Sequence, residues 1–222
     1  PAEKGWARRF THPLLDVDVV YTLTDAAALK AEALAHFGLE AGKPVVLVVG
    51  GSLGTRTLNE AMKAHADEIV REGRFQVIWQ TGKYYEREMD EFMRGRDARG
   101  IWRGAFIERM DLAYAAADIV VARSGAGTVS ELCLVGKAVV FVPSPNVAED
   151  HQTKNAMALA DRGAALVVPD REAVARVFSE AGRLLADDAM RSEMEKNIRA
   201  LAVADSADRV ADEILKVVKR SE

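Results

Sequence analysis

Cysteine is nearly absent from this chain, since Cys133 is the one cysteine among 222 residues. A single thiol excludes an internal disulfide framework and fits a reducing compartment. Cys133 stands among Leu132, Leu134 and Val135, so we expect a buried apolar thiol rather than a nucleophile.

A basic excess and long apolar runs are also missing. The 34 acidic and 30 basic residues give a net charge of −4, which argues against electrostatic binding of nucleic acid. No apolar run approaches the roughly 20 residues of a membrane span, and no signal peptide with a basic start and an apolar core is found. The chain begins at Pro1 without an initiator Met, which indicates a processed or truncated form.

Hydrophobic residues make up 49% of the chain, enough for a sizeable core in one large domain or one domain with an appendage. Continuous apolar runs rich in β-branched residues predict strands that are buried on both faces. Six such runs alternate with segments of helical spacing, so we expect an α/β fold with a doubly wound, parallel, six-stranded sheet. The expected strands are 45–49, 75–80, 101–106, 118–122, 138–142 and 164–168. The expected helices are 25–36, 55–70, 84–93, 109–116, 150–162, 171–186, 188–202 and 207–219.

The most informative stretch is Arg123–Glu131, which follows the fourth expected strand and leads into a helix that ends at Gly136. Gly125 and Gly127 would let the backbone turn tightly. The start of a helix offers unpaired N–H groups and the positive end of the dipole, which suit a phosphate. Thr128 and Glu131 have the spacing of a capping box, so an ordinary capped helix is the alternative.

A second glycine-rich loop, Gly50–Gly54, follows the first strand. With the usual strand order 3-2-1-4-5-6, the topological switch point lies between strands one and four, where ligands bind in such sheets. The loops 50–54 and 124–127 are therefore expected to flank one crevice, which favours a phosphate ligand. Gly-x-Gly-x-x-Gly with an acid after strand two is absent, as is a P-loop, so common NAD and ATP sites are not expected.

Three motifs resemble the MurG family of bacterial N-acetylglucosaminyl transferases that complete lipid II. They are Gly50–Gly54, Arg123–Glu131 and Pro143–Ala156, in the order and spacing of that family. The resemblance implies the second Rossmann-like half of a GT-B fold, which binds UDP-N-acetylglucosamine. It further implies inverting transfer to lipid I without a divalent metal or other cofactor, by an enzyme peripheral to the cytoplasmic membrane face.

The resemblance also implies a donor site. Ser52, with Gly51 and Gly54, would meet the diphosphate, and Phe106, Ile107 and Met110 would seat the uracil, with the Ile107 main chain reading the base edge. Glu131 would accept the ribose hydroxyls, and Gln152 would read the sugar hydroxyls. The sugar and phosphates would lie at the helix start, within Arg123, Ser124, Gly125, Ala126, Gly127, Thr128, Val129 and Ser130.

Each of these residues has a plainer alternative. Ser52 would only cap its helix, Phe106 and Met110 would belong to the core, and Gln152 would be a solvated first-turn residue. His151 is expected at the surface rather than as a base. Asp16-Val17-Asp18 resembles a metal-holding pair of some sugar transferases, but a strand edge or turn is favoured.

Residues 1–25 are expected to be irregular and lack the motif that precedes this half in the family. We divide the chain into an atypical segment with a linking helix (1–40), a UDP-sugar-binding domain (41–204) and a C-terminal helix (205–222). The general base and the membrane contact would come from the family's other half, and Arg123 is a candidate for charge stabilisation. Two alternatives stay open: a non-catalytic UDP-sugar-binding subunit that needs a partner chain, and a UDP-N-acetylglucosamine 2-epimerase.

Overall fold

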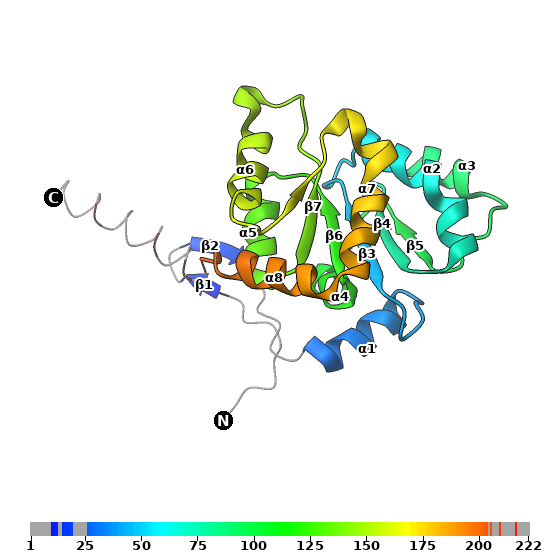
Figure 1. Ribbon diagram of the computed structural model, residues 1–222, viewed down its shortest axis with the longest axis horizontal. Coiled ribbons are helices and arrows are strands. Elements are labelled where there is room, and N and C mark those ends of the chain that lie inside the picture. The colour runs from blue at the N-terminus through cyan, green and yellow to red at the C-terminus, as the bar shows by residue number, and fades with distance from the viewer. Residues whose placement is uncertain are drawn as a thin grey trace.

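The computed structural model describes residues 10–12, 15–19 and 26–203, together with residues 205, 209 and 216. Its centre is a parallel six-stranded sheet in the order β5-β4-β3-β6-β7-β8 (Figure 1). This order confirms the expected doubly wound sheet with the switch point between β3 and β6. The strands are β3 (Val45–Val49), β4 (Gln76–Gln80), β5 (Ile101–Gly104), β6 (Ile119–Ala122), β7 (Ala138–Phe141) and β8 (Leu166–Val167). β5 and β8 are shorter than the sequence predicted.

Helices cover both faces of the sheet (Figure 1). The residues of one core come from α2 (Arg56–Glu72), α3 (Glu86–Met93) and α7 (Asp170–Ala186). Those of the other core come from α1 (Ala26–His36), α4 (Met110–Ala116), α5 (Ala126–Val135) and α6 (His151–Ala160), the last preceded by the short 3-10 helix η1 (Ala148–Asp150). Helix α8 (Asp188–Arg199) joins both layers, because Met194 packs into the first core and Ile198 into the second.

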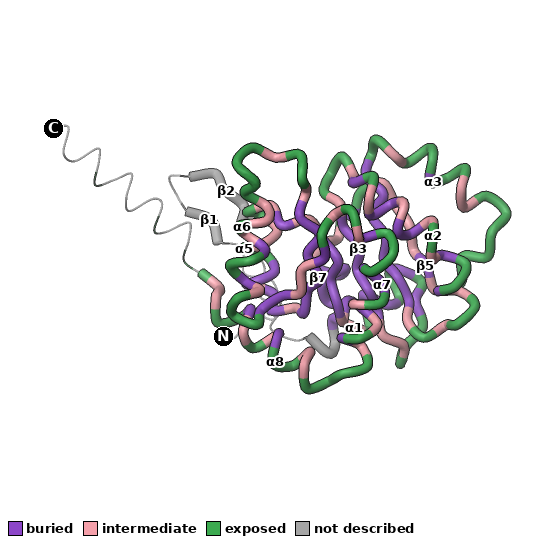
Figure 2. Tube along the Cα trace, turned by 45° about the horizontal axis from the view of Figure 1, so that its top comes forward, coloured by how far each residue is buried: buried purple, intermediate pink, exposed green. Residues whose placement is uncertain are grey.

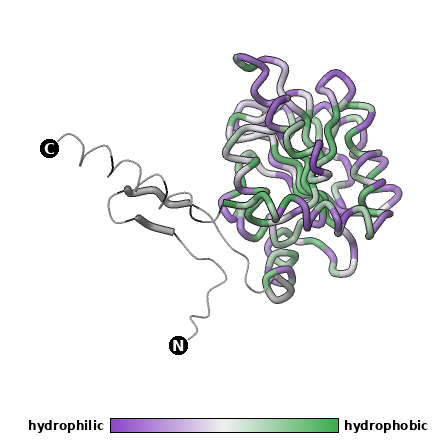
Figure 3. Tube along the Cα trace, turned by 60° about the vertical axis from the view of Figure 1, so that its left-hand side comes forward, coloured by the Kyte–Doolittle hydropathy of each residue, from purple (hydrophilic) through white to green (hydrophobic). Residues whose placement is uncertain are grey.

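The central strands are buried along their whole length (Figure 2). Successive side chains of a strand point to opposite faces. Val46 and Val48 therefore join one core, while Val45, Leu47 and Val49 join the other. Figure 3 shows the same pattern as a hydrophobic centre with hydrophilic loops around it. Burial on both faces explains why these strands are apolar throughout rather than alternating.

Cys133 lies in α5 and is 5% exposed, and burial raises the pKa of its thiol. The expected buried apolar thiol is therefore confirmed. Two further expectations need correction at their boundaries. Helix α6 ends at Ala160 rather than Arg162, and α8 ends at Arg199 rather than Ala202.

The irregular N-terminal segment was a wrong prediction. β1 (Phe10–His12) and β2 (Leu15–Val19) form an antiparallel pair, with Asp16-Val17-Asp18 inside β2, as the strand alternative for these residues expected. The short strands lack the continuous apolar run that identified the others. The predicted helix 207–219 lies almost wholly outside the described residues.

Helix α1 packs against α4 and contributes Leu29, Ala33 and Leu34 to the core. The division of the chain at residue 41 stays a prediction, with this helix closely attached to the sheet domain. None of the helices in the described part of the chain is long and apolar enough to cross a membrane.

Candidate functional site

A crevice of about 620 Å³ opens at the carboxyl ends of β3 and β6, at the switch point of the sheet. This volume lies within the roughly 300–1,000 Å³ that is usual for ligand pockets. Both glycine-rich loops border the crevice, as the sequence predicted. Eight of the sixteen predicted site residues line it: Gly51, Gly54, Met110, Arg123, Gly125, Thr128, Glu131 and Gln152.

In the first loop, Gly50–Gly54, the carbonyl oxygens of residues 50–53 all accept hydrogen bonds from the protein. The donors to residues 50, 51, 52 and 53 are Thr55 Oγ1 at 2.8 Å, Gly54 N at 3.0 Å, Lys83 N at 3.2 Å and Tyr84 N at 3.4 Å. The N–H groups of residues 51–53, in contrast, donate to no protein group in the part of the chain that the structure describes. A loop with paired acceptors and unpaired donors is suited to an anion.

Two glycines of this loop have backbone conformations that other residues rarely adopt, with φ of +82° at Gly51 and +86° at Gly54. The loop leads into α2 through Thr55, which is the N-cap residue. Ser52 is exposed and lies outside the cap position, so the plainer alternative for Ser52 as a helix cap is wrong. Its side chain is not part of the crevice wall.

The second loop differs from the prediction in two respects. Helix α5 begins at Ala126 with Gly125 as its N-cap residue, and no side chain caps it. Thr128 therefore lies inside the first turn, and the predicted capping box of Thr128 and Glu131 is wrong. Gly125 has an ordinary φ of −64° and Gly127 lies within the helix, so neither glycine is needed for a tight turn.

The glycines of the second loop instead leave open space. A Cβ atom added at Gly125 or Gly127 would meet no other atom within 4 Å. The first N–H groups of a helix have no partner inside it, and here they belong to the turn that starts at Ala126. The crevice therefore has a second set of backbone donors besides those of the first loop. Gly125, directly before these donors, has no side chain that would block them.

Glu131 lines the crevice from α5 and is exposed, while Tyr114 of α4 is 4% exposed. Tyr114 Oη donates a 2.9 Å hydrogen bond to Glu131 Oε2. Burial, followed by the nearby carboxylate, raises the pKa of Tyr114 well above its usual range, so the phenol stays a donor. The bond holds one carboxylate oxygen of Glu131, and the other makes no hydrogen bond within the described residues.

Arg123, predicted as a candidate for charge stabilisation, is already neutralised. Its Nη1 donates to the carbonyl oxygens of Val142 at 2.8 Å and Pro143 at 3.0 Å. The same atom lies 2.6 Å from Asp170 Oδ1, an ion pair without hydrogen-bond geometry. With only 15% of its side chain exposed, Arg123 ties the end of β6 to the loop after β7 and the start of α7.

Gln152 and Ser124 join the second loop to α6. Ser124 is fully buried, and its Oγ donates to the carbonyl oxygen of Gln152 at 2.8 Å, so Ser124 does not offer its hydroxyl to the crevice. Gln152 Oε1 accepts from Ser144 N at 2.9 Å. The carboxamide is thus oriented, with its NH₂ as the remaining group, and the solvated alternative for Gln152 is wrong because the residue is half-buried in the crevice wall.

Helix α6, expected from residue 150, begins at His151. Asp150 is the N-cap residue, with φ of +52°, but its carboxylate accepts from Thr153 Oγ1 at 2.6 Å rather than from a backbone N–H. His151 is exposed, as predicted, and its Nδ1 lies 2.9 Å from the carbonyl oxygen of Ala148.

The predicted base-binding residues follow β5. Phe106 is 50% exposed, so the core alternative is wrong for it, whereas the Ile107 side chain is 3% exposed and belongs to the core. Neither the N–H nor the C=O of Ile107 bonds to another backbone group in the described part of the chain. Met110 lines the crevice while packing on the core.

The remaining predicted residues lie on α5 but not in the crevice wall. Ala126, Gly127 and Ser130 are exposed, and Val129 packs against the core. Their side chains are therefore not brought to the ligand space, although the first-turn backbone is beside it.

Residues that the sequence analysis missed also line the crevice. Gln80 ends β4, and Ser144 and Asn146 follow β7, so their places after parallel strands at the carboxyl edge were a usable signal. Tyr114 lies inside α4 and Asp170 in the first turn of α7, so neither follows the end of a strand and neither gave such a signal.

Comparisons with known proteins agree with this geometry. A family model described as the glycosyltransferase family 28 C-terminal domain matches residues 45–210. The UDP-N-acetylglucosamine–N-acetylmuramyl-(pentapeptide) pyrophosphoryl-undecaprenol N-acetylglucosamine transferase of Parabacteroides distasonis is 46% identical over 198 residues, 89% of this chain and 54% of that protein. The protein of the same name from Porphyromonas gingivalis is 47% identical over 193 residues, 86% of this chain and 50% of that protein.

Among solved structures, Acinetobacter baumannii MurG matches with a TM-score of 0.68 and 29% identity, over 90% of this chain and 58% of that chain. The chain spans about half the length of the curated relatives it matches. The family model covers most of the chain, including both glycine-rich loops, Glu131 and Gln152. The chain therefore belongs to the glycosyltransferase family 28 C-terminal domain family.

Proposed function

We propose that this chain binds UDP-N-acetylglucosamine and forms the donor half of a hexosyltransferase of peptidoglycan synthesis. The whole enzyme would transfer N-acetylglucosamine to lipid I and form lipid II. The names of the relatives support this substrate pair, since they describe N-acetylglucosamine transferases with a pyrophosphoryl-undecaprenol acceptor.

The observation that carries the proposal is the composition of the crevice. Unpaired N–H groups of residues 51–53 and the first turn of α5 supply donors for a diphosphate, and Glu131 supplies a carboxylate for a diol. Donors that are fixed before the reaction stabilise the negative charge that develops on a leaving diphosphate. Glu131, a single acid beside these donors, suits the ribose hydroxyls of a nucleoside diphosphate.

The remaining roles follow from the accessible groups. The unpaired main chain of Ile107 would read the uracil edge, with Phe106 and Met110 beside the base. Gln152 would donate its NH₂ to an oxygen of the sugar, because its Oε1 is held by Ser144 N. Arg123 has no part in charge stabilisation in this proposal, since its Nη1 atom donates to two carbonyl groups and its charge is paired with Asp170.

The proposed reaction is inverting and independent of a divalent metal. The muramoyl hydroxyl of lipid I would attack the anomeric carbon as it loses its proton, and the bond from that carbon to the UDP oxygen would break. This chain would hold the donor and stabilise the leaving UDP through its backbone donors. The general base, the acceptor site and contact with the cytoplasmic membrane face are assigned to the part of the whole enzyme outside the matched half.

Titration calorimetry with UDP and UDP-N-acetylglucosamine tests the donor site. We expect heat of binding from both ligands, and a loss with Glu131→Gln but not with Glu193→Gln, an α8 carboxylate that does not line the crevice. Absence of heat at millimolar ligand would contradict the proposal.

A second measurement separates a donor half from a complete enzyme. We expect no turnover when a lipid I analogue and UDP-N-acetylglucosamine are added to this chain alone. Turnover by the chain alone would refute the half-enzyme proposal, and formation of UDP-N-acetylmannosamine would indicate the epimerase alternative instead.

A further inference from the structure

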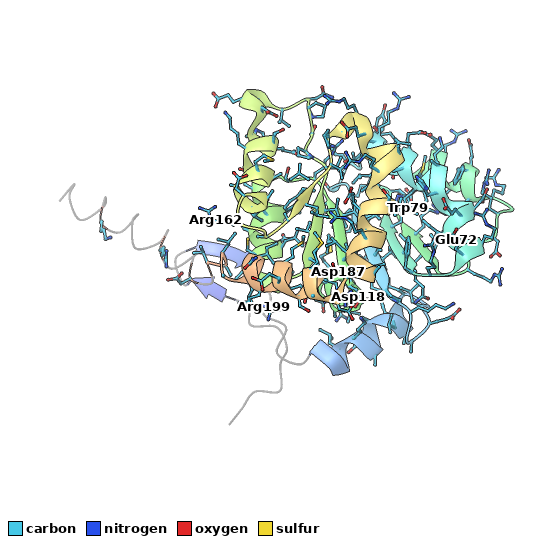
Figure 4. All side chains as sticks on the ribbon, viewed as in Figure 1. Glu72, Trp79, Asp118, Arg162, Asp187 and Arg199 are labelled. Carbon is cyan, nitrogen blue, oxygen red and sulfur yellow. The ribbon has the colours of Figure 1, made fainter. Side chains whose placement is uncertain are left out.

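A buried side-chain amide in α2 links this helix to β4 and to the residue that follows the strand. Asn59 is 1% exposed, and its Oδ1 accepts a 2.8 Å hydrogen bond from Trp79 Nε1 in β4. Its Nδ2 donates to the carbonyl oxygen of Thr81 at 2.9 Å, just beyond the end of β4. Trp79 is fully buried and is labelled in Figure 4. Both ends of the carboxamide are thus committed, which fixes the backbone at Thr81 with respect to α2.

The segment that follows Thr81 packs backbone to backbone against the first glycine-rich loop. A Cβ atom added at Gly82 would overlap the Cα and N atoms of Gly54, and one added at Gly54 would overlap the carbonyl oxygen of Thr81. The two glycines are therefore in direct contact, and no side chain separates the chains. Any movement of Thr81 is passed directly to Gly54.

The same segment decides which way the peptide groups of the loop point. Lys83 N and Tyr84 N donate to the carbonyl oxygens of Ser52 and Leu53. In a trans peptide the C=O and the following N–H point in opposite directions. Drawing the Ser52 oxygen toward the 83–84 segment therefore turns the Leu53 N–H away from it. Without these bonds the loop would be able to present carbonyl oxygens, which repel a phosphate.

We propose that Asn59 is a positioning residue for the diphosphate of the donor, acting through Thr81 and the Gly54–Gly82 contact. It touches neither the crevice nor the ligand. By holding the 81–84 segment, it keeps the carbonyl oxygens of Ser52 and Leu53 turned away and the Leu53 N–H available. The inference rests on the proposed function, because it requires that the loop binds the diphosphate of a UDP-sugar.

A matched pair of variants tests this role. Gln76 lies at the other end of β4, is 2% exposed, and makes two side-chain hydrogen bonds, both to the backbone, with Glu40 N at 2.7 Å and Glu40 O at 2.8 Å. Asn59→Ala and Gln76→Ala each remove the two hydrogen bonds of a buried carboxamide, so similar drops in melting temperature are expected. We expect Asn59→Ala alone to lower UDP affinity, by about tenfold to a hundredfold, the worth of one hydrogen bond to a charged group.

Comparing uridine with UDP separates a specific effect on the diphosphate from general destabilisation, which would not change the ratio of the two affinities. Uridine lacks phosphates, so its affinity, measured by NMR titration below the melting temperature of each variant, should be nearly the same in both variants and the unaltered chain. Trp79→Phe removes the donor to Asn59 Oδ1 but keeps a ring in the core, and is expected to give a smaller loss of UDP affinity in the same direction.

A second pair tests the glycine contact itself. Gly82 and Gly42 both have φ of +81°, but a Cβ atom at Gly42 would meet nothing within 4 Å. Gly82→Ala and Gly42→Ala therefore share the cost of the backbone conformation and differ in the clash with Gly54. We expect UDP affinity to fall only in Gly82→Ala, with uridine affinity retained.

The outcomes separate the two proposals. Failure of the unaltered chain to bind UDP would overturn both the donor site and the positioning role. Binding of UDP by the unaltered chain, with equal affinities for Asn59→Ala and Gln76→Ala, would overturn the positioning role alone. A parallel loss of uridine and UDP affinity in Asn59→Ala would also overturn it, because the effect would then not belong to the diphosphate. If Asn59→Ala does not fold, Trp79→Phe and the glycine pair decide by the same criteria.

Discussion

In the loop Gly50–Gly54, Gly51 and Gly54 have φ near +80°, whereas Gly125 in the other loop of the crevice has a φ of −64° and Gly127 is helical. An added Cβ would overlap the backbone at Gly54 but would enter open space at Gly125. The first loop thus needs glycine for its own folding, and the second does not. The second has glycine in front of a helix start, where the missing side chain leaves room for a ligand. Glycine is therefore required for the backbone conformation in the first loop and leaves space for a ligand in the second.

Gly54→Ala should have the largest effect on stability. The substitution combines a left-handed backbone conformation with a clash against Thr81, and we expect a loss of about 3 kcal/mol or more in the free energy of unfolding. Gly51→Ala shares the conformation without the clash and should cost about 1–2 kcal/mol. Urea unfolding measures both, and equal losses would contradict the close packing of Gly54.

Glu131→Ala should have the largest effect on binding at the second loop. We expect UDP affinity to fall by about tenfold to a hundredfold, the worth of a hydrogen bond to a charged group. Affinity for free phosphate should change little, because the carboxylate is assigned to the ribose. Calorimetry with both ligands checks this prediction, and an equal loss for UDP and phosphate would move Glu131 away from the ribose role.

Gly125→Ala should separate binding from folding. Its φ and ψ suit alanine and its surroundings are open, so we expect the free energy of unfolding to change by less than about 1 kcal/mol. The new methyl group would occupy ligand space, and UDP-N-acetylglucosamine affinity should fall by about tenfold. A large loss of stability with unchanged affinity would mean that the second glycine loop resembles the first.

The smallest expected effect concerns the Tyr114–Glu131 bond. Burial raises the pKa of Tyr114, so the folded state keeps the proton that the unfolded state loses near pH 10. Its contribution to stability is complete below about pH 10 and falls as pH rises above that value. Between about pH 9 and about pH 11, the free energy of unfolding should decline less with pH in Tyr114→Phe than in the unaltered chain. Urea unfolding at several pH values measures this dependence, and the same decline in both proteins would contradict the buried phenol.

The sheet could be predicted because its strands are buried on both faces and are therefore apolar at every position. Val45–Val49 and Ala138–Phe141 are such runs, and the strand order expected for them was the usual one of doubly wound sheets. The edge strand β8 has two half-buried residues and was predicted too long. The paired strands β1 and β2 were missed because they lack that apolar signature.

Without the family resemblance, the site was predictable only where it consists of backbone and strand ends. Gly51, Gly54, Gly125 and Thr128 line the crevice because loops after adjacent parallel strands meet at one edge. The capping box failed because its spacing does not depend on where the helix begins. The helix begins at Ala126, with Gly125 as its N-cap residue, three residues before Thr128.

The sequence by itself determined the parallel sheet, its order and the meeting of two glycine-rich loops, because hydrophobic burial and chain connectivity are local or topological properties. Only the tertiary structure decided which peptide oxygens are held away from the crevice, that Tyr114 orients Glu131, and that Asp170 neutralises Arg123. These are contacts between side chains or loops that lie far apart in the sequence. Their geometry depends on how the layers pack, which no single stretch of the chain specifies.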